Sequence, residues 1–269
     1  MSVLRRNNVK VFGSGTAAII FVHGYGCDQN MWRLITPAFQ EEYKIVLFDH
    51  VGFGKSDLGA FHSSKYGSLG DYARDLLEVC HELGLQKAIL VGHSVGAMIG
   101  ILAAMQEPDL FSRLVLIGPS PCYINDDEYI GGFTRADIDG LLEFLDSNHL
   151  GWSKTMAPVI MGNPDRPELA EELANSFCNT DPEIAKHFAR VTFLSDNRAD
   201  LAKVSVPSLI LQCSEDAIAP AAVGDYVHRN LANSSLIQLK ATGHCPQLSA
   251  PWETIAAMIA GLGAIPDQR

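Results

Sequence analysis

The sequence lacks the patterns that stabilise small secreted proteins and structural metal sites. Its six cysteines are spread along 269 residues without a Cys-x-x-Cys pair, so neither a disulfide framework nor a thiolate metal site is expected. We expect reduced thiols that pack as small apolar side chains. No stretch approaches the roughly 20 apolar residues of a membrane span, and no apolar run of a secretory signal follows Arg5 and Arg6. These absences predict a cytoplasmic protein that does not enter a membrane.

Positive charge is also scarce. The chain has 20 Lys and Arg against 31 Asp and Glu, a formal net charge of -11. Such a field repels nucleic-acid phosphates and anionic membrane surfaces, so neither is an expected partner. A neutral or weakly charged small molecule suits the charge better. With 47% hydrophobic and 19% charged residues, the whole chain is expected to fold around one large core.

Short apolar runs alternate with amphipathic, helix-like patterns along the chain. Strands are expected at 17–22, 44–48, 88–91, 114–117, 208–212 and 235–239. The alternation predicts an α/β fold in which a mostly parallel sheet is covered by helices on both faces. In such sheets the ligand site lies at the carboxyl ends of the strands. We expect residues 1–269 to form a single domain.

About 90 residues separate the fourth expected strand from the fifth, which is too long for a loop. Helix-like segments at 135–147, 168–178 and 182–193 fill this stretch and are rich in bulky apolar side chains. We expect residues 120–195 to be a helical lid inserted over the end of the sheet. The alternative is a peripheral helical layer without a role in ligand binding.

The strongest functional signal is Gly92-His93-Ser94-Val95-Gly96, between an expected strand and a helix-compatible run. This G-x-S-x-G pattern forms a sharp strand-to-helix turn that exposes the serine hydroxyl at the end of a sheet. The two glycines remove Cβ atoms that would clash in so tight a turn. Ser94 is therefore the candidate nucleophile.

A serine hydroxyl needs a base to take its proton and a carboxylate to orient that base. His244 follows the expected strand at 235–239, and Asp216 follows the one at 208–212. Their order along the chain, Ser then Asp then His, is that of the α/β-hydrolases. The oxyanion formed in acyl transfer needs two backbone donors. Val95, after the nucleophile, and Tyr25, in a glycine-bounded turn after the first expected strand, are the candidates.

Other assignments can be compared with this one. Glu215 adjoins Asp216 and is the rival acid, whereas 119–121 (PSP) offers no carboxylate after the fourth expected strand. His93 points away from its own turn, and His23 is expected to order a loop. A metal site made of His23, Cys27, His244 and Cys245 matches no ligand spacing. We expect neither a metal nor a cofactor.

Five segments carry a more specific likeness: 9–15 (VKVFGSG), 26–29 (GCDQ), 92–100 (GHSVGAMIG), 119–125 (PSPCYIN) and 129–133 (YIGGF). They resemble the RsbQ-like α/β-hydrolases, bacterial stress-signalling proteins related to the plant strigolactone and karrikin receptors. The segments 52–57 (GFGKSD), 178–185 (CNTDPEIA) and 211–213 (LQC) are closer to the bacterial branch. The resemblance runs from about residue 8 to about residue 255 and implies an eight-stranded sheet with a four-helix lid.

In that family the lid covers a deep apolar pocket. The resemblance places these residues around it: Tyr25, Tyr123, Phe133, Trp152, Met156, Phe193 and Leu248. Tyr25 and Met156 stand where the family usually has Phe. A hydroxyl and a flexible thioether change the polarity and shape of a pocket, so the ligand preference of the family does not transfer automatically.

Together these features predict a serine hydrolase that cleaves a carboxylic ester or butenolide-type lactone of a small apolar molecule. Haloalkane dehalogenation is excluded because it needs a carboxylate where Ser94 stands, while perhydrolase and carbon–carbon bond hydrolysis remain alternatives. By resemblance, the chain acts in stress signalling with a phosphatase that carries a PAS domain. The alternative function is a ligand-sensing protein that binds such a partner and hydrolyses its ligand slowly.

Overall fold

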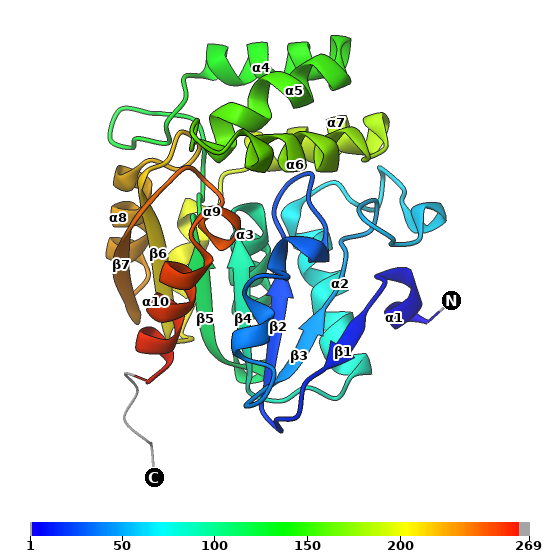
Figure 1. Ribbon diagram of the computed structural model, residues 1–269, viewed down its shortest axis with the longest axis vertical. Coiled ribbons are helices and arrows are strands. Elements are labelled where there is room, and N and C mark those ends of the chain that lie inside the picture. Colours follow the sequence, from blue (N-terminus) through cyan, green and yellow to red (C-terminus); the bar gives the residue numbers. More distant parts are fainter. Residues whose placement is uncertain (1, 264–269) are drawn as a thin grey trace.

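Seven strands form one sheet at the centre of the computed structural model, which describes residues 2–263 (Figure 1). They are β1 (Lys10–Phe12), β2 (Ala18–Val22), β3 (Lys44–Leu47), β4 (Ala88–His93), β5 (Phe111–Ile117), β6 (Ser208–Glu215) and β7 (Ser234–Thr242). Their order is β1-β3-β2-β4-β5-β6-β7. Only the β1–β3 pair is antiparallel. The expected mostly parallel sheet is confirmed.

The expected number of strands, eight, is wrong for the described residues. The segment ahead of β1 forms a short helix, α1 (Val3–Arg6), instead of a further strand. β1 itself is an exposed edge strand of three residues. Residues with positive φ bound it on both sides, Asn8 at 46° and Gly13 at 94°. These left-handed conformations interrupt the extended chain, so the edge cannot lengthen.

Helices cover both faces of the sheet. They are α2 (Leu69–Glu82), α3 (Val95–Gln106) and α8 (Ala221–Asn230) on one face and α10 (Pro251–Gly263) on the other. Alternate residues of β2 supply the two apolar layers, because successive side chains of a strand point to opposite faces. Ile20 and Val22 belong to the cluster that contains α2 and α3, whereas Ile19 and Phe21 belong to the cluster that contains α10.

Four helices connect β5 to β6 and lie over the carboxyl ends of the strands, at the top of Figure 1. They are α4 (Arg135–Ser147), α5 (His149–Met161), α6 (Pro167–Cys178) and α7 (Pro182–Phe193), and we call them the cap. The remaining short elements are α9 (Pro246–Ser249) and the 3-10 helices Gln29–Trp32, Thr36–Ala38, Leu58–Ala60, Pro108–Leu110 and Arg198–Lys203. Among residues 2–263, no helix has the length and apolar character needed to cross a membrane.

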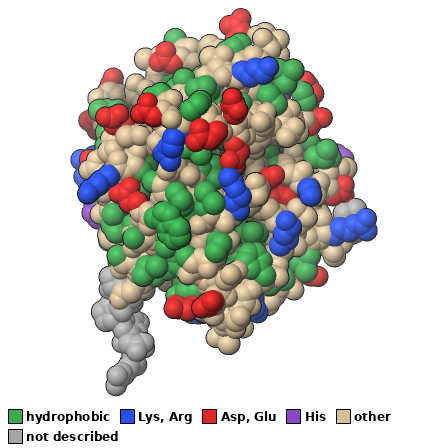
Figure 2. Space-filling model, viewed as in Figure 1, with side chains coloured by type: hydrophobic (Ala, Val, Ile, Leu, Met, Phe, Trp, Pro, Cys, Tyr) green, Lys and Arg blue, Asp and Glu red, His purple; other side chains and the backbone are tan. Residues whose placement is uncertain are grey.

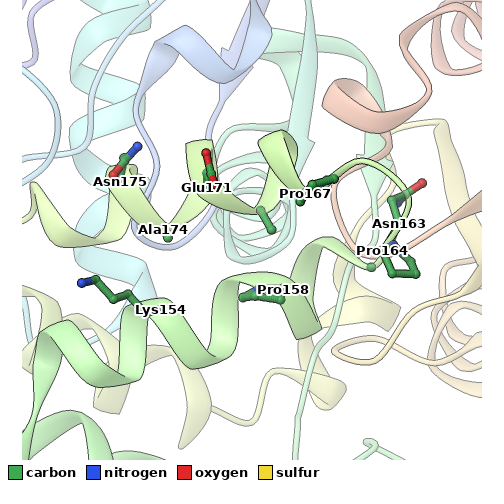
Figure 3. A pocket seen from close by; sticks show the side chains of 10 residues that line it. Lys154, Pro158, Asn163, Pro164, Pro167, Glu171, Ala174 and Asn175 are labelled. Carbon is green, nitrogen blue, oxygen red and sulfur yellow. The ribbon is translucent and has the colours of Figure 1, made fainter.

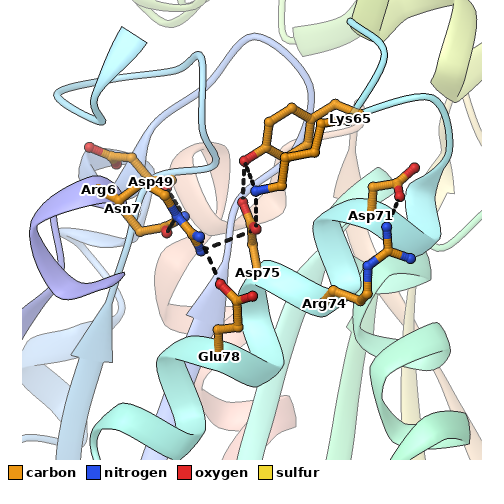
Figure 4. Close-up of polar contacts among 9 residues, drawn as sticks. Arg6, Asn7, Asp49, Lys65, Asp71, Arg74, Asp75 and Glu78 are labelled. Atoms are coloured by element: carbon orange, nitrogen blue, oxygen red, sulfur yellow. Dashed lines mark hydrogen bonds and ion pairs between the residues drawn. The ribbon is translucent and has the colours of Figure 1, made fainter. Parts of the chain in front are cut away.

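A buried polar cluster fastens α1 to α2 (Figure 4). The Asp75 carboxylate, 2% exposed, lies 3.1 Å from Nη2 of Arg6 and 3.2 Å from Nζ of Lys65. It also accepts the Tyr66 hydroxyl at 2.7 Å. A buried carboxylate is tolerated only when it is paired and hydrogen-bonded, and these three partners meet that requirement. The cluster therefore anchors the N-terminal segment beside the edge of the sheet.

Charge on the surface is mixed. On the face shown in Figure 2, basic side chains are scattered among acidic ones and form no continuous basic patch. This face offers no footprint of the kind that nucleic-acid binding needs.

Candidate active site

Ser94 occupies the sharp turn between β4 and α3. Its backbone has φ 55° and ψ -125°, a strained conformation for a residue other than glycine. The Ser94 N–H donates to the Ile117 carbonyl at 2.8 Å, which ties the turn to the end of β5. The strain is held by the surrounding structure, as in the strand-turn-helix that this motif predicts.

The two glycines of the motif allow the turn to pack closely. A Cβ on Gly96 would lie 2.5 Å from the carbonyl oxygens of Val22 and His23, and one on Gly92 would lie 2.6 Å from the Cα of Ala97. Real Cβ atoms do not approach backbone so closely. Gly96 thus brings the Ser94 turn against the turn that follows β2.

Ser94, His244 and Asp216 form one chain of hydrogen bonds at the carboxyl ends of β4, β7 and β6. Nε2 of His244 lies 2.7 Å from Oγ of Ser94, and Nδ1 lies 2.7 Å from Oδ2 of Asp216. With the Nδ1 proton donated to the carboxylate, Nε2 is left to accept the Ser94 proton. All three side chains are buried.

The environment of Asp216 favours its charged form. Burial alone would raise the pKa of this carboxyl, but the His244 ring and the N–H groups of Ala219 and Ile218 together lower it. Those amides donate to Oδ1 at 3.0 and 2.8 Å. The side chain of the rival acid Glu215 is exposed at the end of β6. The structure therefore places Asp216, rather than Glu215, against His244.

His93 has a positioning role that the sequence did not reveal. Its Nε2 donates to the carbonyl of His244 at 2.7 Å, and the His244 N–H donates to the Ile160 carbonyl in α5 at 2.8 Å. Burial, aided by the nearby His244, lowers the pKa of His93 to about 3, so this imidazole is neutral. The backbone of His244 is thus held from two sides. No spacing rule predicts this contact, which joins residues 151 positions apart.

His23 orders the turn after β2. Its Nδ1 donates to the Gly24 carbonyl at 2.9 Å, and its Nε2 accepts the His50 N–H at 3.0 Å. Burial lowers the pKa of both His23 and His50, which keeps both rings neutral. His23 is occupied by these bonds and is not free to bind a metal with Cys27 or Cys245. Within residues 2–263, no group of three His, Cys, Asp or Glu side chains is arranged to hold a metal ion.

The expected oxyanion donors lie on the two turns that meet at Gly96. Val95 is the first residue of α3, and Tyr25 lies in the turn after His23. The first N–H groups of a helix have no partner inside the helix. Among residues 2–263, neither the Val95 N–H nor the Tyr25 N–H donates to another residue. Both donors are available beside Ser94.

A small cavity of about 30 Å³ lies between Ser94 and the cap, and we call it the Ser94 cavity. It is lined by Tyr25, Cys27, His93, Ser94, Tyr123, Ile160, Leu173, Phe177, Thr192, Phe193, Ile218, His244 and Cys245. A cavity of this volume has room for water but not for a substrate of even modest size.

The residues expected around the pocket are distributed unevenly. Tyr25, Tyr123 and Phe193 line the Ser94 cavity. Trp152 is buried behind it, with its ring centre 5.8 Å from that of Tyr25. Three others are absent from this lining: Leu248 lines a neighbouring hollow together with Cys27, Phe133 is half-buried just ahead of α4, and Met156 is half-buried in α5. Sequence reasoning missed the lining residues that the resemblance did not name, above all Thr192 and Ile218.

The Tyr25 side chain links its turn to the cap. Its hydroxyl donates to the Ala185 carbonyl in α7 at 3.0 Å. Its ring lies 5.9 Å, centre to centre, from Phe177, Phe188 and Phe193. Burial raises the pKa of the hydroxyl, so it stays protonated and remains a donor. One residue therefore offers its backbone N–H near Ser94 and its hydroxyl to the cap.

A larger hollow of about 620 Å³ lies on the outside of the cap, between α5 and α6 (Figure 3). Lys154 and Pro158 lie on α5, and Glu171, Ala174 and Asn175 lie on the neighbouring helix α6. None of its lining residues belongs to the Ser94 cavity. The hollow contains no nucleophile paired with a base, so the chemistry belongs to the smaller cavity.

Comparisons with known proteins agree with this fold. The model of the alpha/beta hydrolase family matches residues 19–258. The strigolactone esterase D14 of Arabidopsis thaliana is 39% identical over 251 residues, which are 93% of this chain and 94% of that protein. The karrikin insensitive 2 receptor IA of Petunia hybrida is 39% identical, over 93% of this chain and 92% of that protein. The structure of olei00960, a hydrolase from Oleispira antarctica, superposes with a TM-score of 0.95 at 39% identity, covering 98% of this chain and 97% of that one.

Acid is expected to destabilise the fold before the carboxylates titrate. Because burial lowers the pKa of His23, His50 and His93, the unfolded chain takes up protons below about pH 6.5 that the folded chain does not. Above that pH these histidines do not lower the free energy of unfolding. Below it, the free energy of unfolding should fall by about 1.4 kcal/mol per pH unit for each such histidine. For His93 the loss ends near its folded pKa of about 3. Urea unfolding at pH 7.5, 6.5, 5.5 and 4.5 measures the slope.

The variant His93→Gln is the matched control for this pH dependence. It removes one titrating ring and keeps a side-chain amide N–H for the His244 carbonyl. In this variant the free energy of unfolding should change less steeply with pH, by the amount that one proton contributes. An unchanged slope would show that His93 is already charged in the folded protein.

The variant Tyr25→Phe is expected to loosen the cap. It keeps the ring and the backbone N–H but removes the hydrogen bond to Ala185, so α7 should move away from the cavity more easily. The ratio of kcat/KM for an eight-carbon to a two-carbon p-nitrophenyl ester should rise several-fold. Tyr129→Phe is the control, because its hydroxyl bonds to Cys122, away from the cavity lining. Equal ratios in wild type and both variants would refute the coupling.

Proposed function

The chain belongs to the alpha/beta hydrolase family, and on that premise we propose that it is a serine hydrolase that cleaves a carboxylic ester or butenolide-type lactone. The observation that carries the proposal is the hydrogen-bonded chain from Ser94 through His244 to Asp216, with both distances 2.7 Å. A base that can take the proton of the nucleophile and a buried carboxylate that orients the base are the requirements of this chemistry.

In the first half of the reaction, Oγ of Ser94 attacks the carbonyl carbon while Nε2 of His244 takes the hydroxyl proton. The carbonyl π electrons move to its oxygen, which accepts hydrogen bonds from the N–H groups of Tyr25 and Val95. Asp216 remains ionised and stabilises the imidazolium. When the tetrahedral intermediate collapses, the bond to the leaving oxygen breaks and His244 protonates that oxygen. With an ester, this half yields a free alcohol and an acyl group on Ser94, whereas with a lactone the hydroxyl end stays attached to that acyl group.

In the second half, water takes the place of the alcohol. His244 removes a proton from the water, the resulting oxygen attacks the acyl carbon, and the same two N–H groups hold the oxyanion. Collapse returns the proton to Oγ of Ser94 and releases a carboxylic acid. The reaction consumes one water molecule and draws on no group beyond these residues.

The character of the cavity supports a small, largely apolar substrate. Its walls are mostly aromatic and aliphatic, and Lys and Arg are absent from its lining. Because about 30 Å³ is too small for an ester, we propose that residues 120–195 act as a lid that moves to admit it. The strigolactone esterase and the karrikin insensitive 2 receptor to which this chain is similar also favour a small-molecule ligand for it.

A second candidate function is ligand sensing with slow hydrolysis. The observations that favour it are the small volume of the Ser94 cavity and the hydrogen bond from Tyr25 to α7, since a ligand that enlarges this cavity changes the position of the cap. A receptor should turn over far below the roughly 10 per second of a typical enzyme. The turnover number separates the two functions.

A place in RsbQ-like stress signalling, with a PAS-domain phosphatase as partner in the cytoplasm, rests on the sequence resemblance alone. We retain it as a hypothesis. Reconstitution with the cognate phosphatase should yield a response that depends on Ser94, and no response would contradict the pairing.

The direct test is hydrolysis of short p-nitrophenyl esters and a butenolide panel by wild type, Ser94→Ala and Asp216→Asn. We expect both variants to lose at least about 1000-fold in kcat, because each removes part of one coupled unit. Glu215→Gln is the matched control and should retain activity, since that side chain is exposed. Wild-type activity that survives in Ser94→Ala would place the chemistry elsewhere.

A further inference from the structure

The hydroxyl of Thr192 is buried without a partner. Thr192 lies in the last turn of α7 and is 1% exposed. Among residues 2–263, no group forms a hydrogen bond with its Oγ1. A threonine inside a helix usually bonds back to a carbonyl in the preceding turn. Thr254 of α10 does this, donating to the Ala250 carbonyl at 3.0 Å, whereas Thr192 does not.

Thr192, the residue that carries this unpaired hydroxyl, lines the Ser94 cavity. Burying a hydroxyl without a hydrogen bond is unfavourable, so its partner is expected to be whatever fills the cavity. Two other hydroxyls of the lining already have partners within the protein: Ser94 bonds to His244, and Tyr25 bonds to Ala185. Nδ1 of His93 is also unpaired, but Gly24 packs against it so closely that a Cβ there would lie 2.7 Å away.

Thr192 and Ser94 approach the cavity from different layers of the molecule. Ser94 projects from the end of the sheet, and Thr192 belongs to the cap, next to Phe193. The ring of Phe193 packs on Tyr123 with the centroids 5.0 Å apart. A ligand with its carbonyl at Ser94 therefore reaches Thr192 with a different part of its structure, among apolar walls.

We propose that Thr192 is a specificity-determining residue that selects esters or lactones carrying a second oxygen, such as an ether, hydroxyl or carbonyl oxygen, remote from the scissile bond. The inference rests on the proposed hydrolase function and makes its substrate class narrower. A hydrocarbon chain in the same position leaves the Thr192 hydroxyl unpaired. The substrate that lacks the second oxygen is therefore disfavoured. A ligand oxygen in that position supplies the hydrogen bond that the Thr192 hydroxyl lacks within the protein.

The test uses Thr192→Val, which keeps the shape of the side chain and removes the hydroxyl. The probes are p-nitrophenyl alkanoates and isosteric alkoxyalkanoates in which one methylene, moved along the chain, is replaced by an ether oxygen. In wild type, one ether position should give a higher ether-to-hydrocarbon ratio of kcat/KM than its neighbours. In Thr192→Val that ratio should fall by roughly 2- to 12-fold, the value of one hydrogen bond. A ratio that is the same in both proteins overturns the proposal.

Thr254→Val is the matched control, a buried helical threonine whose hydroxyl is satisfied. It should leave the substrate ratio unchanged and lower the melting temperature. Thr192→Val should melt at the same temperature as wild type or higher, because it removes a buried polar group that has no partner. Equal loss of melting temperature in both variants would show that the Thr192 hydroxyl is bonded within the protein, which also overturns the proposal.

A binding measurement separates this proposal from the hydrolase function. Melting shifts caused by the same ester pair are recorded for Ser94→Ala and for Ser94→Ala with Thr192→Val, where no turnover is needed. If wild type fails to hydrolyse any ester but the ether probe shifts the single variant more than the double variant, the hydrolase function fails and the role of Thr192 stands. If the two variants shift equally with both probes, the role of Thr192 fails.

Discussion

The close approach of the Ser94 turn to the end of β2 is the contact on which the site depends. Gly96 packs so near the carbonyls of Val22 and His23 that a Cβ would lie 2.5 Å from each. Because of this contact, the turn that exposes the nucleophile and the turn that carries the Tyr25 N–H stand side by side. The strained backbone of Ser94 then persists because its neighbours hold it, through the bond from its N–H to Ile117 and the packing of α3 on the sheet.

The order of the strands accounts for the rest of the reacting geometry. β4, β5, β6 and β7 are adjacent and parallel, so the residues that follow β4, β6 and β7 emerge at the same edge. This is why Ser94 and His244, 150 positions apart, share a hydrogen bond. Parallel strands place such residues near one another, but orientation needs further contacts. Asp216, His93 and the Ile160 carbonyl fix the His244 ring and backbone.

Much of this could be predicted from the sequence because its signals are local. Five of the six expected strands are mostly buried, largely apolar runs, and the G-x-S-x-G turn and the Ser, Asp, His order are short motifs. What could not be predicted is set by packing between distant segments. β1 is an exposed edge of only three residues, too short to show the period of a strand, and the hydrogen bond from the His93 ring to the His244 carbonyl has no sequence signature. Resemblance named Phe133 and Met156 as pocket residues, but the closed cap leaves them outside the cavity lining.

The cap is joined to the reacting groups by hydrogen bonds as well as by apolar packing. The Tyr25 hydroxyl donates a hydrogen bond to a carbonyl of α7, and the His244 N–H donates one to a carbonyl of α5. Movement of either helix therefore strains a residue with a place in the proposed mechanism. A ligand can open this cap only by as much as it binds the open state better than the closed one. Hydrolysis and sensing then require the same opening, and they differ in how fast water removes the acyl group from Ser94. In the proposed mechanism that rate is set by the groups around the Ser94 cavity.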